Sequence, residues 1–121
     1  MTPRVIFVGL LWAAPLAAQD LVGPSGLKLD LFEVLIEEAP QIARLRYVAT
    51  GVTDFEQVSA DFAWLCQNHA LPALRQNGWQ GAQVVISIAS EIRPFGEFHT
   101  EIIQFFEGYR PDGDTCIWEA F

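Results

Sequence analysis

Residues 53–78 of this chain read TDFEQVSADFAWLCQNHALPALRQNG, and this stretch decides the fold. Thr53 followed by Glu56 three residues later is typical of a capping box, so we expect a helix to begin there. Pro72 should kink or restart this helix, and the pair Asn77-Gly78 should end it. Apolar positions recur at helical spacing and predict one face packed against a sheet: Phe55, Val58, Phe62, Leu65, Cys66 and His69.

The segments on either side of the helix have the alternation of β-strands. They predict five strands: 27–38, 42–49, 83–90, 101–109 and 115–121. The apolar phase slips near Leu31, which indicates a bulge, and residues 111–114 form a strong turn signal. The order β-β-α-β-β-β predicts one α+β domain over residues 27–121, with a mixed or antiparallel sheet and the long helix on one face. The other face must then be solvated or occupied.

The first eighteen residues have the pattern of a secretory signal. Arg4 precedes an almost unbroken apolar run from Val5 to Ala14, and small residues follow up to Ala18. The run is shorter than the roughly 20 residues that cross a bilayer, which favours a cleaved signal over a membrane anchor. We therefore expect cleavage near Ala18, a flexible lead-in over residues 19–26, and a periplasmic or secreted protein without a membrane span.

Composition excludes two classes of protein. The 121 residues are 51% hydrophobic, which fits one folded domain and excludes intrinsic disorder. The chain has seven basic and 15 acidic residues, which gives a net charge of −8. Loss of Arg4 with the signal would change the net charge to −9. Nucleic acid is therefore not an expected partner, because its binding requires clustered Lys and Arg.

Export changes how the two cysteines are interpreted, because disulfides persist in oxidising compartments. Cys66 and Cys116 lack the Cys-x-x-Cys spacing of redox or metal sites, so we predict one structural bridge. It would tie the middle of the helix to the last strand and contribute up to about 4 kcal/mol in the chain-entropy model.

Two histidines are the candidates for acid–base or metal chemistry. His69 lies on the apolar stripe of the helix, where a hydrogen-bonded core histidine is the simpler interpretation. His99 lies between Glu97 and Glu101, so a small hydrolase using His99 with either carboxylate, with or without a metal, is the alternative function. Because no His-Glu-x-x-His, nucleophile-elbow or phosphate-loop motif is present, we predict no catalytic residue, no metal ligand and no cofactor.

The binding candidates are Arg44, Arg46 and Trp64. The two arginines face three glutamates of the preceding strand, a pattern that predicts cross-strand charge pairs on a solvent face: Glu33, Glu37 and Glu38. Trp64 falls on the opposite side of the helical wheel from the apolar stripe. It is either an interface anchor or is covered by a loop or chain terminus.

Three segments carry a family resemblance: DFAWLC at 61–66, QFFEGYR at 104–110 and CIWEAF at 116–121. They resemble a family of small exported alphaproteobacterial proteins classed as a domain of unknown function. The resemblance covers nearly all of the mature chain. It implies a paired Cys66 and Cys116 and a location in a Gram-negative envelope, and it supplies no catalytic residue.

These observations predict a non-enzymatic binding or protein-interaction module with a protein partner in the cell envelope. The binding surface would be an uncovered sheet face or the Trp64 side of the helix. Oligomeric state has no signal in the sequence.

Overall fold

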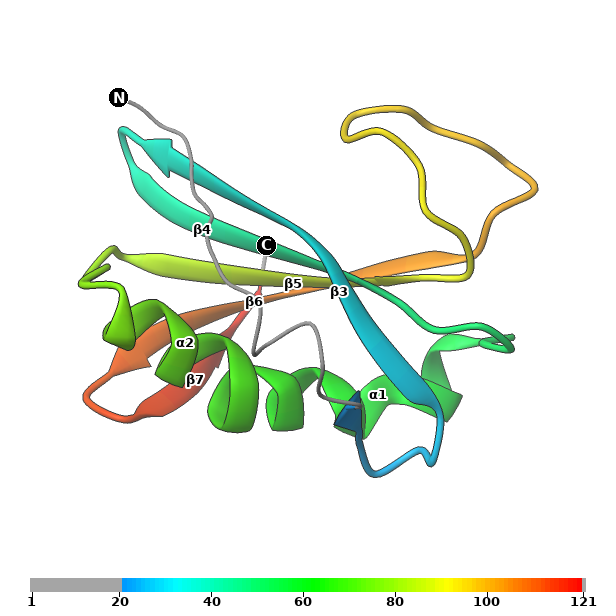
Figure 1. Cartoon of the computed structure of the whole chain (residues 1–121), viewed down its shortest axis with the longest axis horizontal. Helices are drawn as coiled ribbons and strands as arrows, with labels where there is room; N and C mark the ends of the chain where they lie inside the picture. The colour runs from blue at the N-terminus through cyan, green and yellow to red at the C-terminus, as the bar shows by residue number, and fades with distance from the viewer. Residues whose placement is uncertain (1–20, 121) are drawn as a thin grey trace.

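A six-stranded mixed sheet with one helical segment against it forms the computed structural model, which describes residues 21–120 (Figure 1). The strands lie in the sheet in chain order: β2 (Leu21–Val22), β3 (Lys28–Glu38), β4 (Gln41–Val48), β5 (Gln83–Ala89), β6 (Gln104–Asp112) and β7 (Thr115–Glu119). Neighbours are antiparallel except β4 and β5, which are parallel because the helical segment connects them. The predicted α+β fold and element order are confirmed, with β2 added at one edge.

The bulge in β3 lies where the apolar phase slips. The register with β4 shifts between Leu31 and Glu33, so Leu29 and Leu31 face the helix before it and Val34 faces the helix after it. Phe32 and Glu33 both lie toward the opposite face, because the extra residue reverses the alternation. The bulge thus confirms the sequence prediction.

The helical segment consists of α1 (Phe55–Leu65), a π-helical turn (Cys66–Ala70) and α2 (Leu71–Gln76). In the wider turn, the Leu71 N–H donates to the Cys66 carbonyl five residues earlier. Pro72 explains this, because it has no N–H to donate and its ring would clash with the carbonyl four residues before it in a regular α-helix. Pro72 therefore restarts the helix, as predicted. Gly78, at φ 79°, follows its end.

The start of α1 differs from the prediction by one residue. Asp54, not Thr53, is the N-cap, and its carboxylate accepts the Gln57 N–H at 2.9 Å. The Gln57 side chain reaches back and accepts the N–H of Thr53, the residue before the cap, at 2.7 Å. Both Asp and Thr cap helices well, so sequence alone did not separate the two positions.

Residues 21–26 are part of the fold rather than the expected lead-in. Leu21 pairs with Leu29, and the turn that follows is held by Asp61 of α1. The Asp61 carboxylate is fully buried and accepts the Ser25 N–H at 2.9 Å together with the Ser25 hydroxyl. A Cβ at Gly23 would lie 2.7 Å from Asp61 Oδ1, so this close approach requires glycine.

The core lies between the sheet and the helical segment. Alternate side chains of β4 and β5 enter it and meet the apolar stripe of α1: Ala43, Leu45, Tyr47, Val84, Ile86, Ile88, Val58, Phe62 and Leu65. Cys66 and Cys116 form the predicted disulfide, with a Cα–Cα distance of 6.2 Å, and so join the π-helical turn to β7. Gln67 supports this join, because its side chain accepts the Cys116 N–H at 3.0 Å and donates to the Asp114 carbonyl.

Within residues 21–120, no helix is long and apolar enough to cross a membrane. The predicted signal sequence and its cleavage site near Ala18 lie outside the described residues.

Candidate functional site

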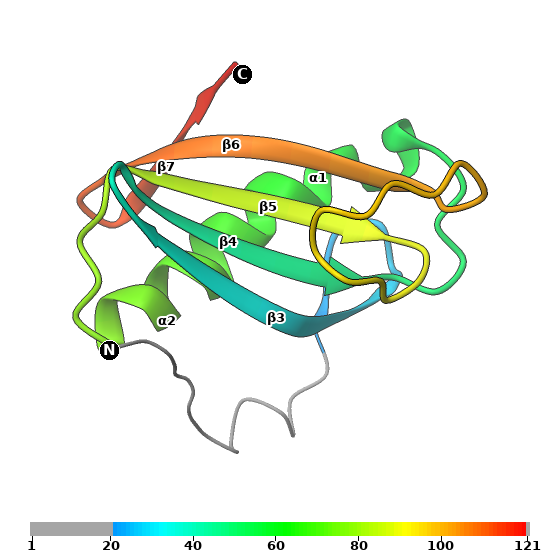
Figure 2. The same ribbon diagram turned by 90° about the horizontal axis from the view of Figure 1, so that it is seen from above.

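The sheet face opposite the helix carries the candidate site and is called the open face here. It is formed by alternate residues of β3 to β6: Phe32, Glu33, Leu35, Glu37, Arg44, Arg46, Val85, Ser87, Ala89 and Phe106. Figure 2 looks onto this face, with the loop of residues 90–103 lying over one end of the strands. Neighbouring residues of β6 lie on opposite faces of the sheet. Phe105 packs against the core, whereas Phe106 is 48% exposed on the open face.

Arg46 lies at the centre of the open face and is only 5% exposed. Its guanidinium donates to the Glu33 carboxylate and, at 2.8 Å, to the Arg93 carbonyl of the loop. The guanidinium carbon also lies 4.8 Å from the centroid of the Phe32 ring. The predicted pairing of Arg46 with a glutamate is confirmed. The expected solvent exposure is wrong, because the loop covers this arginine.

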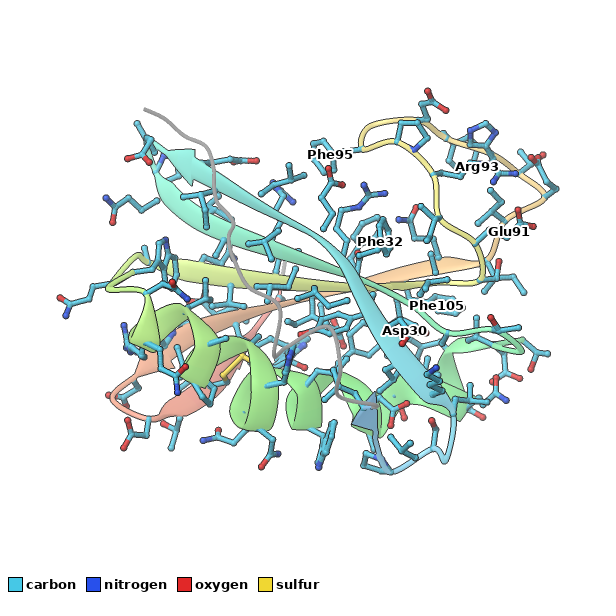
Figure 3. The ribbon with its side chains drawn as sticks, viewed as in Figure 1. Asp30, Phe32, Glu91, Arg93, Phe95 and Phe105 are labelled. Carbon is cyan, nitrogen blue, oxygen red and sulfur yellow. A yellow bond between two sulfur atoms is a disulfide. The ribbon has the colours of Figure 1, made fainter. Side chains whose placement is uncertain are left out.

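Arg44 forms the second cross-strand pair, at 2.7 Å from its Nε to Glu37 Oε2. Arg44 and Arg46 both lie 5.5 Å from the centroid of the Phe95 ring, so one loop aromatic contacts both cations. Figure 3 shows Phe32 and Phe95 on the side of the sheet away from the helix. Glu38, the third glutamate expected to pair, belongs to neither of these two ion pairs.

The loop of residues 90–103 is fixed at its base. The Ser90 N–H donates to the Ile103 carbonyl at 2.8 Å, and the Ile103 N–H donates to the Ser90 hydroxyl at 3.2 Å. Three apolar side chains of the loop are nevertheless exposed, namely Ile92, Phe95 and Phe98, the last at 86%. Single exposed apolar side chains are common on protein surfaces, but here three of them lie on one anchored loop.

His99 is brought together with both predicted carboxylates. Its Nε2 lies 2.9 Å from Glu97 and its Nδ1 lies 3.4 Å from Glu101. The hollow beside it, which Arg46 and Arg93 also line, has a volume of about 10 Å³ and accommodates about one water. Over residues 21–120, no three His, Cys, Asp or Glu side chains gather in a way that could hold a metal ion.

His69 occupies the opposite side of the sheet, in the core. Its Nδ1 lies 2.7 Å from the Tyr47 hydroxyl, and both side chains are buried. Burial lowers the pKa of His69 and raises the pKa of Tyr47, so Tyr47 donates and a neutral His69 accepts. The interpretation of His69 as a hydrogen-bonded core histidine is confirmed.

Trp64 lies on a different surface from Arg44 and Arg46. It is half-buried and packs against the core from α1, whereas Arg44 and Arg46 alternate with the core residues of β4 and lie on the open face. The three predicted binding residues therefore belong to two separate surfaces.

Sequence reasoning missed Ser87, Phe95 and Phe106. The Ser87 hydroxyl is buried without a hydrogen-bond partner among residues 21–120, next to Arg46 on β4 and Phe106 on β6. The alternation of β5 and β6 was a usable signal, since it assigns Ser87 and Phe106 to the face away from the helix. Phe95 had no such signal, because its place depends on how the loop folds back.

A wider hollow of about 350 Å³ lies between the helical segment and the β6–β7 turn. Its lining residues Gln67 and Arg75 hold that turn, and Arg75 donates to the Gly113 carbonyl at 3.2 Å. The polar side chains that line this hollow therefore serve to hold the β6–β7 hairpin.

Fold and site together define a small, disulfide-linked α+β domain with one sheet face closed by a helix and the other carrying paired arginines among exposed aromatic side chains. A family model described as "Family of unknown function (DUF6497)" matches residues 9–121, and the chain belongs to that family. Comparisons with curated proteins and with solved structures found no match.

Proposed function

We propose that this chain is an exported, non-enzymatic interaction module that binds a protein partner through the open face. The observation that carries the proposal is the group of exposed aromatic side chains around two fixed arginines. Phe95 and Phe106 are 50% and 48% exposed, and Arg44 and Arg46 lie beside Phe95. Aromatic and arginine side chains are enriched at the energetic centres of protein interfaces.

The rigidity of this face supports binding. The covered Arg46 bonds Glu33 and the Arg93 carbonyl and contacts the Phe32 ring, so the strands and loop of this face are ordered before a partner arrives. A face that is already ordered can use its exposed aromatic area for affinity.

The overall charge supports a particular kind of partner. At −8 for the whole chain, the protein attracts basic surfaces and repels acidic ones. In an envelope, this favours a basic protein over an anionic membrane surface.

The alternative, a hydrolase that uses His99 with Glu97 or Glu101, has the histidine–carboxylate distances in its favour. The hollow of about 10 Å³ beside His99 is far smaller than the roughly 300–1,000 Å³ of usual small-molecule pockets. The geometry therefore supports binding through the open face better than catalysis at His99.

Position-specific photo-crosslinking in the native envelope tests the proposal. Phe106 or Phe95 is replaced by p-benzoylphenylalanine, and Ser59, on the exposed side of α1, is the matched control position. We expect one common adduct from positions 106 and 95 and none from 59. Equal adducts from all three positions, or none from the open face, would contradict the proposal.

Export is tested separately. We expect the protein in the periplasmic or secreted fraction, with an intact mass that begins at Gln19. A cytoplasmic protein that retains residues 1–18 would remove the export part of the proposal and leave the open-face part in place.

A further inference from the structure

The outer edge of β3 is a second surface, which shares Glu33 and Glu37 with the open face and adds the strand's outward backbone groups and the side chains of Val34 and Ile36. β2 pairs with this edge only at Lys28 and Leu29, while β4 pairs with the other edge as far as Glu38. From Asp30 to Glu38, alternate backbone N–H and C=O groups therefore point outward without a sheet partner in the described part of the chain. Such an edge is a template for one more strand.

The side chains along this edge alternate in character. Val34 and Ile36 lie opposite Leu45 and Ala43 on the helix side of the sheet, yet they are 42% and 43% exposed. On the other side, Glu33 and Glu37 alternate with a leucine. The edge thus presents an apolar row on one face and an acidic row on the other.

The two glutamates keep capacity for further bonds. Within residues 21–120, Glu33 and Glu37 each bond an arginine of β4 through one carboxylate oxygen. A carboxylate accepts about four hydrogen bonds, so a cation on the outer side can bind without displacing the inner arginine.

The protection of this edge is selective, because its charges are all of one sign. Edge strands are commonly blocked by Lys, Pro or a bulge, and here the bulge lies at one end, between Leu31 and Glu33. Residues 33–38 beyond it contain three glutamates and no basic residue. Their charge repels acidic strands and favours a basic one.

We infer that the outer edge of β3 accepts an extended segment of a protein partner as an added strand, in which apolar residues alternate with Lys or Arg. The apolar residues pack beside Val34 and Ile36, and the basic ones face Glu33 and Glu37. Backbone hydrogen bonds provide affinity, and this alternation provides specificity.

A second copy of the chain fits this edge poorly. Antiparallel pairing of two β3 strands about Leu35 would place Glu33 of each copy opposite Glu37 of the other. Like charges directly opposite one another destabilise a strand pair.

The test uses the purified exported protein and a fluorescent peptide, acetyl-Lys-Val-Lys-Ile-Lys-Val-Lys-amide, with binding followed by anisotropy and by amide NMR. We expect saturable binding, with the largest amide shifts in residues 30–38. The same peptide N-methylated at alternate residues keeps its side chains and charge but loses ladder donors, and it should bind about tenfold more weakly.

Two matched variants separate strand addition from simple charge attraction. Val34→Lys with Ile36→Lys should weaken peptide binding about tenfold, through lost cross-strand contacts and added repulsion. Ile117→Lys with Trp118→Lys makes the same charge change on the exposed side chains of β7, the other edge strand, and should leave binding nearly unchanged. Amide spectra check that both variants stay folded.

Three results would overturn the inference: equal binding of the N-methylated peptide, equal losses in both lysine variants, or a β3-mediated dimer in sedimentation. Phe106→Ala should bind the peptide normally. The edge can therefore fail while the open face still crosslinks its partner, and the reverse also holds.

Discussion

The two faces of the sheet are covered in different ways. The face under the helix buries apolar side chains, and the contact between Tyr47 and His69 among them is a hydrogen bond between neutral groups. The open face buries the charge of Arg46 by surrounding it with Glu33, a loop carbonyl and an aromatic ring. One strand, β4, supplies both sets in alternation. Stability should therefore come mainly from the helix side, while the open face keeps aromatic side chains such as Phe95 and Phe106 exposed.

The comparison is tested most strongly by two phenylalanines. Phe62 is fully buried under the helix and Phe106 is half-exposed on the open face. Phe62→Ala should lower the free energy of unfolding by about 3–5 kcal/mol through lost burial and a cavity, and Phe106→Ala by less than about 1 kcal/mol. Chemical denaturation of both variants measures this. Similar losses would show that the open face is a second core.

The disulfide should give the next largest effect, since it anchors the helix side to β7. Replacing both Cys66 and Cys116 by Ala should lower the free energy of unfolding by about 2–4 kcal/mol, because the unfolded chain regains the freedom of a 50-residue loop. The intact mass of the unreduced protein should also rise by two hydrogens on reduction. Free-thiol labelling of the unreduced protein would contradict the bridge.

Tyr47→Phe should cost about 1–3 kcal/mol, because it leaves the buried Nδ1 of His69 without its donor. Thermal or chemical unfolding at neutral pH measures the loss. Val48→Thr, on the same strand but half-buried away from the core, is the matched control and should change stability little. An unchanged stability in Tyr47→Phe would mean that the hydrogen bond contributes nothing.

The same pair predicts a pH dependence. Burial lowers the pKa of His69 below its usual 6.5, so below that pH the unfolded chain binds more protons than the folded one. Stability should therefore be full above the unfolded pKa and fall as pH drops from 6.5 toward the lower folded pKa. His69→Gln should flatten this part of the profile, and His99→Gln should retain it.

The smallest predicted effect is on the open face. The Ser87 hydroxyl is buried and has no hydrogen-bond partner in the part of the chain that the structure describes, so Ser87→Ala should raise stability by up to about 1 kcal/mol. A loss of stability instead would show that this hydroxyl has a bonded water.

Local signals predicted much of this fold because the rules behind them act over a few residues. The slip near Leu31 gave the bulge, and Pro72 gave the restart of the helix. The cap moved by one residue, from Thr53 to Asp54, because neighbouring positions both satisfy the rule.

Contacts between distant segments escaped prediction. Arg46 looked like an exposed member of a surface ion pair, and its burial depends on Arg93, which is 47 residues away. The strand β2 was missed for the same reason, since two residues have no periodicity and their place depends on Leu29 and Asp61. Sequence identified the paired arginines of the site, and only the folded loop showed which aromatic side chains surround them.

The bridge between Cys66 and Cys116 also makes the stability of the protein depend on the redox state of its surroundings. Where thiols are kept reduced, the same chain lacks a cross-link worth about 2–4 kcal/mol, a large part of the stability of a domain this size. In a reducing compartment the chain would therefore resist unfolding less than it does once the bridge has formed. A single covalent bond can thus set when, as well as where, this fold becomes durable.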